Sequence, residues 1–79
     1  MPSKNFAIKI ASVPYREELV AEIYYNHEQW VEISQKQEQL IIRFYTPLNN
    51  NYWEFPLNEA LEALEQAKKK ILALGGKKT

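Results

Sequence analysis

The chain has 79 residues, of which ten are Lys or Arg, ten are Asp or Glu and none is Cys. This length fits one domain, residues 1–79, near the lower limit for a core that stabilises itself. The absence of cysteine excludes a disulfide framework, a thiolate nucleophile and a Cys-based zinc site, so stability must come from burial or from self-association. The net charge of zero removes the general electrostatic attraction of nucleic-acid-binding and membrane-surface proteins.

Four stretches of the chain show the period-two alternation of half-buried strands. In the first, apolar residues alternate with smaller or charged ones until Pro14, which marks a turn or an irregular connection. Asn26 begins the next turn, because asparagine tolerates the left-handed backbone of short hairpin loops. A polar segment at residues 36–39 precedes the last stretch, which ends at Pro47. The predicted strands are residues 5–12, 19–25, 29–35 and 40–46.

The polar segment between the last two strands predicts how they pair. A tight turn at residues 37–38 places Ile33 opposite Ile42 and Val31 opposite Phe44. Both pairs then lie on one aliphatic face of the sheet. Consecutive hairpins of this kind form an antiparallel meander.

The apolar period then changes to the three-and-four spacing of one helix face, in a window rich in strong helix formers. The sequence predicts a helix over residues 57–74, docked on the aliphatic sheet face through Leu61, Leu64 and Ile71. Residues 75–79 begin with two glycines and are predicted to form a disordered tail. The predicted fold class is α+β, a four-stranded antiparallel β-meander with one C-terminal helix packed on one face.

The sheet face that the helix leaves uncovered combines aromatic rings with charged side chains. The same pairing places Trp30 opposite Tyr45 there, and Glu32 opposite Arg43. Two aliphatic side chains and three rings on one uncovered face favour a protein interface or the seam of a homodimer. The alternative is an exposed sheet whose rings only stabilise cross-strand contacts. The predicted partner-binding residues are Tyr24, Trp30, Tyr45, Val20, Ile41 and Arg43.

The chain offers few groups for catalysis or for metal binding. Glutamate is its only carboxylate side chain, because aspartate is absent, and His27 is its only imidazole. His27 has no second His, Cys or Asp near it in the sequence, so we interpret it as a solvated turn residue. The only glycines are Gly75 and Gly76, which leaves no Gly-rich phosphate loop. The sequence therefore predicts no enzyme, no cofactor and no catalytic, cofactor-binding or metal-binding residues.

The sequence also bears on location and on nucleic acid. The N-terminus leads directly into the first strand pattern and no long apolar run follows, so we expect a cytoplasmic protein without membrane association. Stacking of nucleic-acid bases on sheet aromatics needs a basic groove beside the rings. Glu22 and Glu32 are expected among the rings instead, which disfavours nucleic acid on this face.

Three stretches of the chain are distinctive as strings of residues. They are residues 10–23, IASVPYREELVAEI, residues 31–35, VEISQ, and residues 53–57, WEFPL, before an acidic helix. Together they resemble a group of short bacterial proteins of unknown function. The resemblance implies a bacterial cytosolic protein and brings no activity, cofactor or catalytic residue with it. Small bacterial α+β proteins of this size often serve as immunity proteins or antitoxins, which is an analogy at the level of the fold.

The favoured function is a non-enzymatic interaction module that binds a protein partner or a second copy of itself through the aromatic face. The first alternative is a small nucleic-acid-associated regulator, which the zero net charge disfavours. An immunity-type or antitoxin-type protein follows from the analogy alone. An enzyme would need a pocket in which one glutamate has a strongly perturbed pKa.

Overall fold

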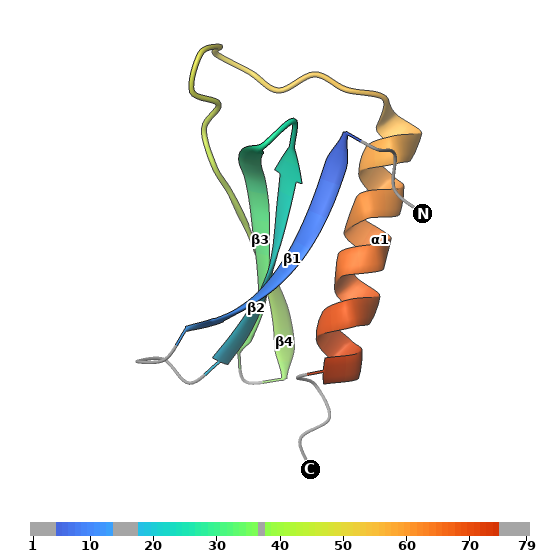
Figure 1. The fold of residues 1–79 in the computed structure, drawn as a ribbon. Coiled ribbons are helices and arrows are strands. Elements are labelled where there is room, and N and C mark those ends of the chain that lie inside the picture. The colour runs from blue at the N-terminus through green and yellow to red at the C-terminus, as the bar shows by residue number, and fades with distance from the viewer. Residues whose placement is uncertain (1–4, 14–17, 37, 75–79) are drawn as a thin grey trace.

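The computed structural model describes residues 5–13, 18–36 and 38–74 of the chain. Its strands form one antiparallel sheet in the order β1-β2-β3-β4, and the helix α1 packs against one face of it (Figure 1). This arrangement confirms the predicted α+β meander. The elements are β1, Phe6–Val13; β2, Glu18–Tyr25; β3, Glu28–Lys36; β4, Gln39–Phe44; and α1, Leu57–Leu74.

Short turns with left-handed backbone join the last three strands. Asn26 and His27 have φ angles of 52° and 72°, which are the positive values that a two-residue hairpin turn of type I′ requires. The turn between β3 and β4 has Glu38 at φ 64°, and Lys36 pairs with Gln39 across it, as the predicted tight turn requires. The predicted turn at Pro14 and the predicted tail lie outside the described residues.

The register between β3 and β4 is the one that the sequence predicts. Val31 pairs with Phe44 and Ile33 with Ile42. Strand β4 ends at Phe44, two residues earlier than predicted, but its pairing continues through one more hydrogen bond. The Tyr45 N–H donates to the Trp30 carbonyl at 2.9 Å.

A β-bulge interrupts the register between β2 and β3. Ile23 pairs with Val31, whereas the next residue, Tyr24, pairs with Gln29, so Trp30 is the extra residue on β3. A bulge of this kind sets two residues against one and redirects a side chain. Trp30 consequently joins Val31 in the core instead of lying on the uncovered face.

The helix spans the predicted residues 57–74 but docks through a different face. Its buried residues are three alanines and Ile71, whereas Leu61 is 52% exposed and Leu64 is only partly buried. The prediction that Leu61 docks the helix was therefore wrong. Alanine side chains let the helix axis come close to the sheet, which moves the larger leucines to one flank. The buried alanines are Ala60, Ala63 and Ala67.

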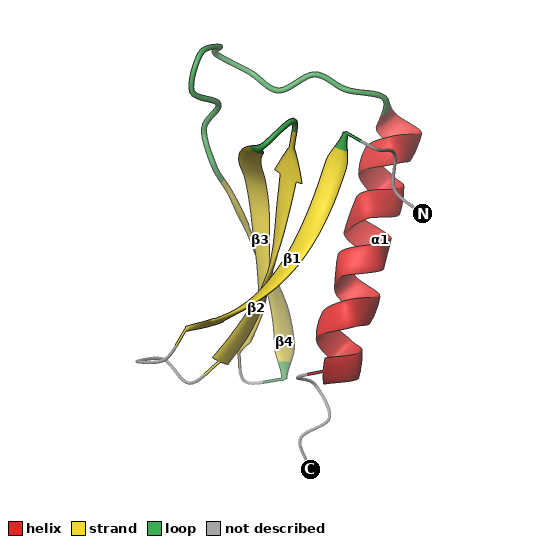
Figure 2. Cartoon of the chain, in the orientation of Figure 1, coloured by secondary structure: helices red, strands yellow, loops and turns green. Residues whose placement is uncertain are grey.

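Aromatic rings close the end of the core where the chain passes from the sheet to the helix. Phe55 lies in the long loop that joins β4 to α1 (Figure 2). Its ring centroid is 4.7 Å from that of Tyr25, 4.8 Å from that of Trp30 and 5.0 Å from that of Phe6. Such tilted and edge-to-face pairs stabilise the fold beyond the area that they bury. The loop is held further by the Trp53 indole N–H, which donates to the Tyr45 carbonyl at 2.8 Å.

Candidate functional site

A row of four charged side chains crosses the sheet face that points away from α1. The register pairs Lys9 with Glu22, Glu22 with Glu32, and Glu32 with Arg43. Two like charges therefore face each other on the central strands, where side chains directly opposite one another repel. The cationic residues occupy the two outer positions of the row.

Two tyrosines satisfy the paired carboxylates. The Tyr24 hydroxyl donates to Glu22 Oε1 at 3.0 Å, and the Tyr45 hydroxyl donates to Glu32 Oε1 at 2.8 Å. The pKa of Tyr24 is raised by burial and then by its bond to Glu22. The pKa of Tyr45 is raised chiefly by its bond to Glu32 and then by burial, against a smaller lowering by Arg43. Both tyrosine hydroxyls therefore donate hydrogen bonds to carboxylates within the sheet.

Four of the predicted partner-binding residues lie on this face and remain accessible. Ile41 and Arg43 are exposed, and Tyr24 and Tyr45 are partly exposed. Val20 belongs to the same face but is only 1% exposed, directly opposite Ser34. Its side chain therefore has almost no surface to offer a partner.

Trp30 departs furthest from its predicted position. It is 7% exposed, and its ring contacts Phe55, Phe6 and Phe44 with centroids 4.8, 5.8 and 6.3 Å away. The bulge is the physical reason, because strict alternation along β3 would have placed Trp30 beside Tyr45. The sequence does contain a signal for it, since Trp30 and Val31 are two consecutive apolar residues in an otherwise alternating strand.

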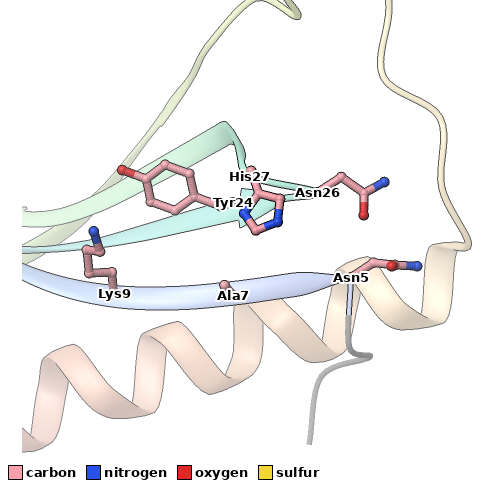
Figure 3. Close-up of a pocket in the computed structure, with 6 residues that line it drawn as sticks. All are labelled: Asn5, Ala7, Lys9, Tyr24, Asn26 and His27. Carbon is pink, nitrogen blue, oxygen red and sulfur yellow. The ribbon is translucent and has the colours of Figure 1, made fainter.

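An open hollow of about 500 Å³ lies at the end of the sheet where β1 begins and where the turn between β2 and β3 lies (Figure 3). The Lys9 ammonium lies 5.6 Å from the centre of the Tyr24 ring, within cation–π range. Figure 3 shows His27 beyond Tyr24, at the turn. His27 is exposed, as expected for a solvated turn residue. The hollow offers exposed donors rather than an enclosed ligand site.

Strand β4 is exposed on both of its faces. Ile41 on the open face is 39% exposed, whereas Ile42 and Phe44 on the helix side are 42% and 64% exposed. Within the described residues no Cα atom of α1 lies within 8 Å of one in β4, because the helix covers β1, β2 and part of β3. The predicted pairs Val31–Phe44 and Ile33–Ile42 therefore run from the core out to an uncovered edge.

The same geometry leaves a groove of about 350 Å³ between the helix and β4. Its floor includes Leu40 and Ile42, and its wall includes Leu61 and Leu64. The sequence did not predict this groove, because it assigned Leu61 and Ile42 to one closed core. Among the described residues the helix reaches β1, β2 and β3 but not β4.

The backbone of β4 also presents an unpaired edge. In an antiparallel pair, alternate residues direct their N–H and C=O groups toward the neighbouring strand. The bond from Tyr45 to Trp30 shows that the odd-numbered residues of β4 face β3. Leu40, Ile42 and Phe44 therefore direct their backbone groups outward, away from the sheet.

The described residues also bear on metal binding and on membrane insertion. Among these residues, no three His, Cys, Asp or Glu side chains are grouped so as to hold a metal ion. Within the same part of the chain, no helix has the length and apolarity needed to cross a membrane.

Comparison of the chain with protein families, curated proteins and solved structures gives no match. Its function has to be inferred from the surfaces described above.

Proposed function

We propose that this chain is a non-enzymatic protein-interaction module whose contact surface is centred on β4. The observation that carries the proposal is the exposure of an apolar strand on both faces and along its outer edge. Natural sheets usually protect an edge with charges, proline or a covering element. In β4 only Arg43 carries a charge, which leaves the strand suited to association.

The chemistry of β4 fits a polypeptide better than a nucleic acid or a small substrate. An added strand binds through backbone hydrogen bonds and gains specificity from pockets for alternate side chains. Leu40, Ile42 and Phe44 provide the outward backbone groups, and the groove beside them receives apolar side chains. The nearest charged row contains the carboxylates of Glu22 and Glu32, which would repel phosphate.

The predicted aromatic face contributes the other side of the same strand. Ile41, Arg43 and Tyr45 flank the outer edge on the face away from the helix, and Tyr24 lies further in on β2. The proposal thus keeps four of the six predicted partner-binding residues and adds the helix side of β4. We place the module in the bacterial cytoplasm, which rests on the resemblance of residues 10–23, 31–35 and 53–57.

The test compares protein capture by the wild type with capture by Ile42→Glu. A matched control is Leu48→Glu, because Leu48 is 80% exposed in the loop after β4. Capture by Ile42→Glu should fall at least about tenfold, as for an interface hot spot, and capture by Leu48→Glu should be unchanged. Phe44→Thr is a second variant that removes an exposed ring while keeping a good strand former. Equal capture by all four proteins contradicts the proposal, provided that circular dichroism shows each variant folded.

A further inference from the structure

We propose that the protein bound at β4 is a second copy of this chain. Its β4 would add antiparallel across a two-fold axis at Ile42, to give one continuous sheet of eight strands. This inference rests on the proposed function and specifies its partner. In such an interface the same patch serves both copies, so the patch has to be complementary to itself.

Charge and composition make this patch self-complementary. The chain has a net charge of zero, so two copies approach without long-range repulsion. The wall of the groove carries Glu65 and Lys68, both exposed, and so presents both signs of charge to a second copy. The apolar part of the strand matches its own copy through Leu40, Ile42 and Phe44. A domain of this size without disulfides also gains most from association.

The backbone parity of β4 selects the register. Pairing through the outer edge requires that outward-facing residues lie opposite one another. An axis at Ile42 sets Ile42 opposite Ile42 of the second copy and Leu40 opposite Phe44 of the second copy. All three outward-facing residues of each strand then take part. On the other face, Arg43 lies opposite Ile41 of the second copy rather than opposite another arginine.

The neighbouring two-fold registers are less favourable. An axis at Arg43 would set two arginines directly opposite each other, which destabilises a cross-strand pair. An axis at Ile41 would set Phe44 opposite Glu38 of the second copy. Glu38 has φ 64° and belongs to the turn, so the strand does not extend that far. The register through Ile42 avoids both conflicts.

The absence of cysteine from the chain allows a direct test of this register. Residues of a hydrogen-bonded antiparallel pair have Cα atoms about 5.5 Å apart, within the disulfide range of about 4.4 to 6.8 Å. Ile42→Cys should therefore form a disulfide-linked dimer under mild oxidation. The control is Leu72→Cys on the helix, because Leu72 is 40% exposed and Ile42 is 42% exposed. The control should remain uncrosslinked.

Sedimentation equilibrium of the wild type and of Ile42→Glu completes the test. The wild-type mass should rise toward twice the monomer mass with concentration, and Ile42→Glu should weaken association at least about tenfold. If the wild type is monomeric but still captures a different protein through Ile42, the partner is not a second copy of this chain. The proposed function then stands. A dimer that neither Ile42→Cys crosslinks nor Ile42→Glu weakens overturns the register and the β4 surface together. If the wild type and Ile42→Glu also capture other proteins equally well, the proposed function is wrong.

Discussion

Replacing Trp30 by alanine separates an interface role for this residue from a core role. If Trp30 lay on the uncovered face, its loss would weaken association and cost little monomer stability. The structure instead buries the indole among Phe55, Phe6 and Phe44, with only 7% of the residue exposed. We therefore expect the main effect of Trp30→Ala on the free energy of unfolding.

The expected loss is large relative to the stability of the whole domain. Truncation of a buried tryptophan to alanine costs about 3 to 5 kcal/mol, through lost transfer energy and the cavity that remains. A domain of 79 residues has a free energy of unfolding of roughly 4 to 12 kcal/mol, at about 0.05 to 0.15 kcal/mol per residue. Trp30→Ala should thus leave a free energy of unfolding of about −1 to 9 kcal/mol at 25 °C, which unfolds the protein if the wild type lies at the low end of its range.

Urea denaturation followed by far-ultraviolet circular dichroism measures this loss. Trp30→Phe serves as the graded comparison, because it keeps a ring against Phe55 and should cost less than the alanine variant. A loss below about 1 kcal/mol for Trp30→Ala would refute the core position, since exposed side chains give changes of that size. It would also refute the bulge as the cause of the inward rotation.

Two further predictions concern the tyrosine bonds and the helix face. Tyr45→Phe removes a donor from the buried carboxylate of Glu32 and should cost about 1 to 3 kcal/mol. Because the pKa of Tyr45 is raised above its ordinary value of 10.0 in the folded state, this shift contributes stability that is fully present below pH 10 and is lost as the pH rises through the folded-state pKa. Urea titrations at several alkaline pH values should show this loss reduced in Tyr45→Phe, and equal slopes would exclude the linkage. Ala63→Leu should cost about 1 to 3 kcal/mol by overpacking a fully buried contact, whereas Leu61→Ala should cost less than about 1 kcal/mol. Thermal melts that rank these two variants in the opposite order would show that the helix docks through its leucines.

The sequence predicts the strand pairing well where local rules act alone. The pairing of Ile33 with Ile42 follows from one tight turn and a strict period of two, and the structure has that pairing. The position of Trp30 depends on tertiary packing, because its large ring packs against Phe55 at the end of the core. A bulge allows this packing by adding one residue to β3. Alternation alone does not locate such an insertion.

The helix is a second case in which the apolar pattern of the sequence predicts only part of the structure. Its boundaries at Leu57 and Leu74 follow from the apolar period and the strong helix formers between them. The docking face of the helix does not follow from this period. The alanine stripe, which contains Ala63, and the leucine stripe, which contains Leu61, lie side by side on the helix surface. The structure buries Ala63 fully and leaves Leu61 half exposed. The closeness of helix and sheet decides between the two stripes, and this closeness depends on the whole core.

The close approach of the helix also accounts for the exposure of β4. A helix seated on alanines sits over β2 and β1 and leaves the fourth strand beyond its reach. Ile42 and Phe44 keep the apolar character of core residues without a covering element in the described chain. A charged residue at either position would protect the edge at little cost to the core, since both side chains are substantially exposed. Apolar residues at these positions are therefore better explained by a surface that becomes buried on association than by the packing of the monomer.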